Sequence, residues 1–217
     1  MQGTINEGKP KGYLTIWNVS KKHNVGNMIR SAVALGMDGV VIIGNRKLQF
    51  FGAKGSDSHI PIHVFPTMEL AKQWFKENNI TVCGVEIDST AKDVREHPFQ
   101  GNTAIMMGNE GDGMDAKQKS FCDYFVYIPQ FGTGTASLNV CVASSIVMHE
   151  YAHWAQYQEA PRQTECDKYV VKAEHRKQII FHKDPNEEEG EETYESGCLF
   201  DSKEDDDENN LSNEEEN

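Results

Sequence analysis

A loop suited to ligand contact leads into an apolar helix in the second half of the chain. The loop reads Ile128-Pro129-Gln130-Phe131-Gly132-Thr133-Gly134-Thr135-Ala136, and Ser137-Leu138-Asn139-Val140 follow at once. The proline and two glycines leave the backbone exposed and able to curve around a ligand. Ser137 and Asn139 place short polar side chains at the mouth of the helix. This composition is typical of a small-molecule binding site.

Two further segments carry residue types suited to catalysis. Asn24 directly precedes a predicted helix over residues 25–35, and Arg30 lies within that helix. Glu110 lies between glycines directly after an apolar strand over residues 103–107. An arginine guanidinium stays protonated at neutral pH, so it can clamp a phosphate or stabilise developing negative charge. The set is therefore compatible with chemistry on a phosphate-bearing substrate.

Alternating strands and helices must position these residues. This alternation predicts an α/β fold in which a parallel sheet is covered by helices on both faces. The predicted strands are 14–19, 39–43, 81–87, 103–107 and 124–128. The predicted helices are 25–35, 68–78, 116–121 and 138–157. Gly36 ends the first of these helices, as a C-terminal glycine should.

The charge of the chain is segregated along the sequence. The 34 acidic and 21 basic residues give a net charge of −13, but residues 184–217 hold 16 of the acids and only one base, Lys203. The first 183 residues therefore carry about +2, which is compatible with a phosphate-rich partner. We predict an extension over 1–10, a main domain over 11–160, a basic segment over 161–183 and a disordered acidic tail over 184–217. The basic segment mixes charged and apolar residues, which predicts a helix or strand lying on the domain.

The cysteines and the hydropathy pattern bear on location. Five cysteines are scattered without a Cys-x-x-Cys pair, which favours reduced thiols inside a cell over disulfides or a cysteine zinc site. No apolar run approaches the roughly 18 residues of a membrane span. We expect a protein of the cytoplasm, with the nucleus or an organelle left open, and no membrane partner.

Taken together, the three segments resemble the motifs of the SpoU (TrmH-like) RNA ribose methyltransferases. That family has Asn-x-Gly-x-x-x-Arg, then a strand leading into Gly-x-Glu-Gly-x-Gly, then Ile-Pro followed by Ser-Leu-Asn-Val. All three occur here in that order, and the resemblance covers about residues 11 to 160. It implies an S-adenosylmethionine-dependent enzyme that methylates a ribose 2′-hydroxyl, works as a homodimer and has the SPOUT fold. The deep C-terminal trefoil knot of that fold is implied by the resemblance alone, because hydrophobic periodicity does not reveal a knot.

The resemblance also assigns roles to individual residues. It implies a catalytic Arg30, supported by four polar residues: Asn24, Glu110, Ser137 and Asn139. It implies cofactor contacts at Met107, Gly108, Ile128 and Leu138. Simpler roles stay open, since the asparagines and the serine could be helix caps, Glu110 a turn residue and Arg30 a surface residue. Whether Arg30 takes the proton or only stabilises charge is also open.

Two points about the function have alternatives: which RNA is the substrate, and whether the chain is an active enzyme. Transfer RNA is favoured over ribosomal RNA, because relatives with only short terminal extensions often act on it. Substrate choice is then expected to come from the domain's own surface, the basic segment or a partner. Asn109 occupies a position that is often serine or alanine in the family, a tolerable departure. The rival class is a non-catalytic binding module that keeps the fold, and the intact set of polar residues argues against it.

One further pattern belongs to a different class of enzyme. His149-Glu150-Tyr151-Ala152-His153 matches the His-Glu-x-x-His pattern of zinc proteases, and it lies on a predicted helix. The histidines continue an apolar helix face formed by Val142 and Ile146, and the third motif already accounts for this helix. We interpret the match as a packed or dimer-facing histidine pair, and expect no metal in the site.

Overall fold

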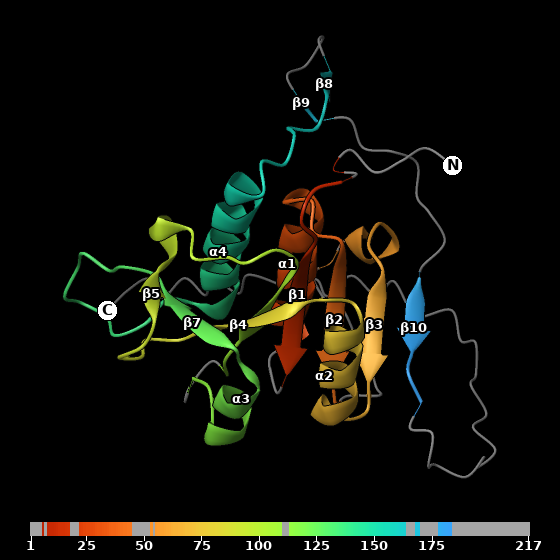
Figure 1. The fold of residues 1–217 in the computed structure, drawn as a ribbon. Coiled ribbons are helices and arrows are strands. Elements are labelled where there is room, and N and C mark those ends of the chain that lie inside the picture. Colours follow the sequence, from red (N-terminus) through yellow and green to blue (C-terminus); the bar gives the residue numbers. More distant parts are fainter. Residues whose placement is uncertain are drawn as a thin grey trace, which may run out of the picture. The chain divides into compact units, whose positions relative to one another are not determined.

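A computed structural model describes residues 6, 8–17, 22–44, 53, 55–109, 113–163, 168–169 and 178–183. Within this part, one eight-stranded sheet has the strand order β10-β3-β2-β1-β6-β4-β7-β5, and every pairing in it is parallel. The strands are β1 Gly12–Trp17, β2 Gly39–Ile43, β3 Ile62–Phe65, β4 Thr81–Val85, β5 Lys92–Asp93, β6 Thr103–Met107, β7 Tyr124–Tyr127 and β10 Ile179–Phe181. The helices are α1 Lys22–Ala34, α2 Met68–Glu77, α3 Ala116–Phe121 and α4 Val140–Trp154, with the short 3-10 turns η1 Ser56–Ser58 and η2 Val94–Glu96. The predicted parallel α/β architecture is confirmed (Figure 1).

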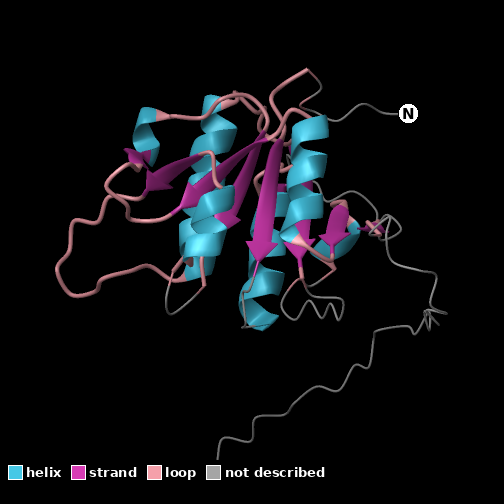
Figure 2. Ribbon diagram, turned by 60° about the horizontal axis from the view of Figure 1, so that its bottom comes forward, coloured by secondary structure: helices cyan, strands magenta, loops and turns pink. Residues whose placement is uncertain are grey.

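The central strands are apolar along their whole length because both faces of the sheet are covered. In β1, Leu14 and Ile16 join the core on one face, whereas Tyr13 and Trp17 join the core on the other. Helices α1 and α4 pack on the first face. Helix α2 and the end of α3 pack on the second face. Figure 2 shows the helices on both sides of the sheet.

Most predicted elements occur, with shifted ends. Strands β2 and β6 and helix α3 have the predicted bounds. Helix α1 begins at Lys22, so Asn24 lies in its first turn and the prediction that Asn24 precedes the helix is wrong. Helix α4 begins at Val140 rather than residue 138, and Asn139 is its N-cap, with the side chain accepting a hydrogen bond from the Cys141 amide at 2.9 Å. Gly36 has a φ of 72°, the left-handed conformation expected after a helix.

The C-terminal end of α4 is fixed to the start of β1. Tyr151 is fully buried and its hydroxyl donates to the Gly101 carbonyl at 3.0 Å. The Tyr157 hydroxyl accepts the Gly12 amide at 3.1 Å and lies 3.0 Å from Asp38 Oδ2. Burial raises the pKa of the Asp38 carboxyl, and its hydrogen bonds to Gly12 and Tyr157 offset part of this shift. These contacts hold the helix that carries the third motif against the centre of the sheet.

The segment after α4 is described only in part. β10 pairs with β3 at the edge of the sheet, which agrees with the predicted strand lying on the domain. Two short strands, β8 Arg162–Gln163 and β9 Lys168–Tyr169, form an antiparallel pair. The acidic tail over 184–217, predicted to be disordered, lies outside the described residues. The described cysteines, Cys83, Cys122 and Cys141, are free thiols. None of the described helices is both long and apolar enough to span a bilayer.

Candidate cofactor and catalytic site

A pocket of about 340 Å³ lies at the carboxyl ends of β4, β6 and β7. Parallel sheets bind ligands at this edge, because successive strands deliver loops and backbone groups to it. The volume is at the lower end of the usual range for small-molecule sites. The residues lining the pocket come from these three strand ends, from the loop before α4 and from the first turns of α4.

The four residues predicted to contact a cofactor all line this pocket. Met107 and Gly108 come from the end of β6, Ile128 follows β7, and Leu138 lies just before α4. Met107 is only 2% exposed, whereas Leu138 is 37% exposed and lies at the surface of the pocket. The fold therefore brings these four residues, which are far apart along the chain, to one pocket.

Gly108 is glycine because the backbone packs against it. A Cβ atom at this position would lie 2.7 Å from the carbonyl carbon of Gly113 and 2.9 Å from the Met114 amide nitrogen. The beginning and the end of the second motif are also joined by a hydrogen bond, since the Asn109 amide donates to the Gly113 carbonyl at 2.9 Å. This close packing fixes the backbone of Gly113, at the end of the second motif, beside Gly108 at the end of β6.

Glu86 is a pocket residue that the sequence analysis missed. It follows β4 directly, and its Oε2 accepts the Met114 amide at 2.9 Å. Lys119 Nζ lies 4.0 Å from the other carboxylate oxygen. Glu86 lines the same pocket as Gly108 and Ile128, so it adds a carboxylate to a wall that contains both apolar and polar residues. A polar residue directly after a buried strand of a parallel sheet is the signal that would have found it.

The loop before α4 forms the remaining wall. Ser137 lines the pocket and is exposed, and its carbonyl accepts a hydrogen bond from Thr135 Oγ1 at 3.0 Å. Gln130 Nε2 donates to the Ala136 carbonyl at 3.5 Å, and this bond joins the two ends of the glycine-containing loop. Asn139 does not line the pocket but caps α4 beside it. Its capping role, one of the alternatives left open, is therefore confirmed.

The first motif is joined to the third through α4. The Cys141 thiol lies 3.3 Å from both the carbonyl oxygen and the side-chain oxygen of Asn24, which is buried. Farther along the two helices, Ser145 Oγ donates to Ser31 Oγ at 2.9 Å. These contacts fix the register of α1 against α4, and so place the first motif beside the start of α4.

Of the described residues that were predicted to be catalytic, only Ser137 lines the pocket. Arg30 is exposed on α1 and is not among the residues that line the pocket of its own chain. Glu110 lies outside the described residues. The described part of the site therefore combines a pocket of mixed apolar and polar lining, the Glu86 carboxylate, and two asparagines, Asn24 and Asn139, at the starts of α1 and α4.

The two histidines of the zinc-protease pattern are not packed in the core. His149 is exposed and lines a second, mainly apolar groove with Leu35, Val142 and Ile146. His153 is also exposed, and its ring lies near that of His97. The prediction of a packed pair is thus wrong, whereas the dimer-facing alternative stays a prediction.

Comparisons with known proteins agree with this description. The sequence model of the SpoU rRNA Methylase family matches residues 11–149. A putative TrmH family tRNA/rRNA methyltransferase of Staphylococcus haemolyticus is 34% identical over 133 residues, covering 59% of this chain and 53% of the relative. A protein of the same description from Staphylococcus aureus (strain COL) is 31% identical over 148 residues, covering 64% and 59%. The chain thus spans a little over half the length of these curated relatives.

Solved structures share the fold. The SpoU methyltransferase AviRb from Streptomyces viridochromogenes superposes with a TM-score of 0.61 at 24% identity, covering 68% of this chain and 61% of that one. The same enzyme in complex with the cofactor AdoMet gives a TM-score of 0.59 at 25% identity, covering 67% and 61%. A TrmH/SpoU tRNA modifying enzyme of A. aeolicus gives 0.59 at 21% identity, covering 70% and 80%.

Proposed function

The chain belongs to the SpoU rRNA methylase family, and from that premise we propose that it is an S-adenosylmethionine-dependent RNA methyltransferase acting on a ribose 2′-hydroxyl. The observation that carries the proposal is the pocket at the carboxyl ends of β4, β6 and β7. It gathers Met107, Gly108, Ile128 and Leu138, the four residues that the motifs assign to the cofactor. The rest of the proposal concerns what this chain's own residues do around it.

The pocket is chemically suited to S-adenosylmethionine. Met107, Ile128 and Leu138 offer apolar surface for a flat heterocycle, and the backbone at Gly108 and Ile128, which also line the pocket, would offer hydrogen bonds to its edge. The Glu86 carboxylate suits hydroxyl groups of a sugar or a positively charged amine. The cofactor would supply a methyl group bound to a cationic sulfur, and the apolar side chains of the pocket would limit the access of water to that carbon.

We propose that Arg30 acts on the substrate as an electrostatic group. Its guanidinium stays protonated at neutral pH, so it is better suited to hold the neighbouring phosphate and stabilise the developing alkoxide than to accept a proton. Asn24 and Asn139, which flank the start of α4, would orient RNA or Arg30, and Glu110 would orient the guanidinium. Ser137, exposed at the pocket wall, would contact the ribose.

We propose transfer RNA as the substrate. The tRNA modifying enzyme of A. aeolicus is matched over 80% of its length, which supports this choice over ribosomal RNA. The first 183 residues carry about +2 in total, so binding would depend on local basic residues and on shape. We place the protein in the cytoplasm, where its free thiols are expected to stay reduced.

We also propose a homodimer and a C-terminal trefoil knot. The second groove, lined by Leu35, Val142 and Ile146 between α1 and α4, supports the dimer because it exposes apolar side chains on two well-packed helices. Val142 is 49% exposed there. An exposed apolar surface of this kind is typical of a protein–protein contact.

Calorimetry with S-adenosylhomocysteine tests the cofactor part of the proposal. We expect one binding site per chain, and no heat of binding up to millimolar ligand would contradict the proposal. A second assay incubates the purified chain with labelled S-adenosylmethionine and either tRNA or ribosomal RNA, followed by digestion to nucleosides. Label in 2′-O-methyl nucleosides of tRNA supports the proposal. Label only in ribosomal RNA would overturn the substrate, and label in a base would overturn the ribose assignment.

A further inference from the structure

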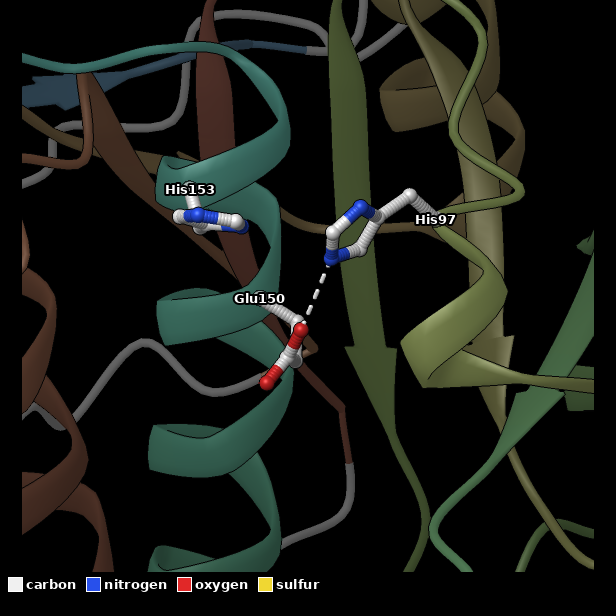
Figure 3. Close-up of side chains that lie close together, drawn as sticks. All are labelled: His97, Glu150 and His153. Carbon is white, nitrogen blue, oxygen red and sulfur yellow. Dashed lines mark hydrogen bonds and ion pairs between the residues drawn. The ribbon is translucent and has the colours of Figure 1, made fainter.

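Three potential metal ligands from two distant segments meet on the α4 side of the sheet. His97 follows η2, whereas Glu150 and His153 lie on α4 (Figure 3). His97 Nε2 lies 2.9 Å from Glu150 Oε2, and the rings of His97 and His153 have their centroids 5.3 Å apart. One ligand atom from each of the three residues lies within 4.8 Å of the other two.

The chemistry of this set matches that of a zinc site. Two imidazoles and one carboxylate are a recurrent ligand set for Zn²⁺. Glu150 and His153 are three residues apart on a helix, so they project from one face, as in the Glu-x-x-His pairs of metal-binding helical bundles. Around a tetrahedral Zn²⁺ with bonds of about 2.0–2.2 Å, ligand atoms lie roughly 3.3 Å apart. Small side-chain rotations therefore bring these three atoms onto a shared ion.

The surroundings leave room for a fourth ligand. His97 and Glu150 are each about a quarter exposed, and His153 is exposed, so water reaches the cluster. Zn²⁺ commonly completes a three-residue site with water. His97 itself is held at a φ of 52° and a ψ of 56°, where its backbone N–H donates to the Val94 carbonyl. This conformation aims its ring across to α4.

We propose that His97, Glu150 and His153 bind one Zn²⁺ ion, with water as the remaining ligand. This site differs from the one that the His-Glu-x-x-His pattern indicates. That pattern would pair His149 with His153, but His149 is not part of the cluster. Both His149 and Glu150 line the apolar groove, and of these two only Glu150 also belongs to the cluster. The third residue comes instead from His97, which is 53 positions away from Glu150 in the sequence.

The ion would link the end of η2 to α4, because its proposed ligands come from both segments. Without metal, Val94 of η2 packs in the same core as α4. His97 and Glu150 add a polar contact that is an ion pair only while the histidine is protonated, and both side chains are partly exposed. An ion pair of that exposure contributes little stability. A metal that binds only the folded chain stabilises it by mass action, in proportion to the logarithm of its free concentration over the dissociation constant. Zinc should therefore raise the thermal midpoint of unfolding.

Zinc titration of the full-length chain tests this proposal. The chain is first stripped with a chelator under reducing conditions, then titrated in a calorimeter, and its thermal midpoint is measured with and without zinc. The test variants are His97→Asn and His153→Ala, and the matched control is His149→Ala on the same helix. Asparagine is chosen at position 97 because it tolerates the left-handed backbone conformation.

We expect one zinc per wild-type chain and a raised thermal midpoint. Both test variants should bind at least about 10-fold more weakly, the size of loss that even an outer-shell change can cause. His149→Ala should bind as the wild type does. Absence of zinc binding by the wild type would overturn the proposal, leaving an ordinary ion pair. Zinc that survives in both test variants would overturn it too, because the ion would then be bound by other residues. Loss in His149→Ala and His153→Ala, with binding kept in His97→Asn, would instead assign the metal to the histidine pair on α4.

Discussion

Arg30 is the single residue on which the proposed chemistry depends most, yet the pocket of its own chain does not include it. Its exposure on α1 is compatible with contact to a phosphate of bound RNA, since a guanidinium forms strong paired hydrogen bonds with phosphate oxygens. The register of α1 against α4, fixed through Asn24 and Ser31, would then determine where that phosphate lies.

Replacing Arg30 separates catalysis from cofactor binding. Arg30→Ala should lower turnover at least about 100-fold, the scale of losing one transition-state donor, while affinity for S-adenosylhomocysteine stays within a few-fold. Arg30→Lys should not restore turnover, because an ammonium cannot reproduce the planar guanidinium. Arg95→Ala, a control at an exposed arginine paired with Asp93, should keep turnover near that of the wild type. Near-normal turnover of the lysine variant would show that positive charge alone suffices.

Gly108 should tolerate no side chain. The added Cβ of Gly108→Ala would lie 2.7 Å from backbone at Gly113, so the second motif must move and the pocket must change shape. Overpacking of this kind typically costs about 1–3 kcal/mol, and we expect at least about 10-fold weaker binding of S-adenosylhomocysteine. Gly134→Ala is the control, because a Cβ there would contact nothing within 4 Å. Equal affinities of the two variants in calorimetry would show that the close packing is unimportant for the pocket.

Single residues were predictable to different degrees. Pocket residues such as Met107 and Leu138 follow from motifs, because strand ends and loops converge at one edge of a parallel sheet. Glu86 was missed since no motif contains it, although it follows a strand. The partner of His153 could not be predicted either, because helix periodicity shows which face a histidine occupies but not which distant segment meets it. His97 supplies that contact from outside the helix.

At the level of elements, long apolar runs were predicted with their bounds. Of the short strands, β3 was not predicted, and β10 lies in a segment for which only a helix or strand without bounds was expected. β2 and β6 are buried on both faces and have continuous apolar sequences, so their bounds were correct. β3 has only four residues and includes His63, which conceals its apolar character. β10 has three residues and is defined by pairing with β3, a long-range contact that local sequence does not reveal.

The contact between β3 and the end of β10 predicts a pH-dependent stability. His63 Nδ1 lies 3.1 Å from His182 Nε2, and burial together with His182 lowers the pKa of His63 to about 4. An unfolded histidine protonates near pH 6.5, so between about pH 6.5 and 4 the unfolded chain binds more protons than the folded one. The free energy of unfolding should therefore fall as the pH drops through this window.

Denaturant unfolding of His63→Gln between pH 4 and 7 tests this. The variant should lose stability less steeply than the wild type on acidification, because glutamine does not titrate. His149→Gln, at an exposed position on α4, should follow the wild-type slope. Identical slopes for the wild type and His63→Gln would show that His63, which is half-buried, does not govern acid stability.

The groove between α1 and α4 provides a test of the dimer. Val142→Asp places a charge on this surface, and a charge buried without a partner costs several kcal/mol. We expect a dimer for the wild type by light scattering, and at least about 100-fold weaker association for the variant. Ile180→Asp on β10 is the control, since Ile180 is 41% exposed and Val142 49%. A monomeric wild type, or a variant that stays fully dimeric, would argue against this interface.

For the whole molecule, charge segregation is the feature that sequence alone makes plain. Deleting residues 184–217 would change the net charge from −13 to about +2. Repulsion of RNA phosphates should then ease, so affinity for RNA should rise at low salt. The gain should shrink toward roughly 0.5 M salt, where the Debye length is only a few ångströms. Affinity for S-adenosylhomocysteine should not change.

Filter binding across a salt series measures this effect, with circular dichroism as the check on folding. Loss of RNA binding, or unfolding of the truncated chain, would mean that the acidic tail is part of the working structure.

The knot is the other property of the whole molecule, and it could only be inferred from family resemblance. Threading depends on the order in which distant segments pass one another, and local patterns do not encode that order.

The central claim is that this chain methylates a ribose 2′-hydroxyl of RNA. Mass-spectrometric mapping of 2′-O-methyl nucleotides tests it most directly, using RNA from cells with the intact gene, without it, and with the gene restored as wild type or as Arg30→Ala. We expect one tRNA position whose methylation disappears without the gene and returns only with the wild-type copy. Unchanged ribose methylation in every RNA class would contradict the proposed function.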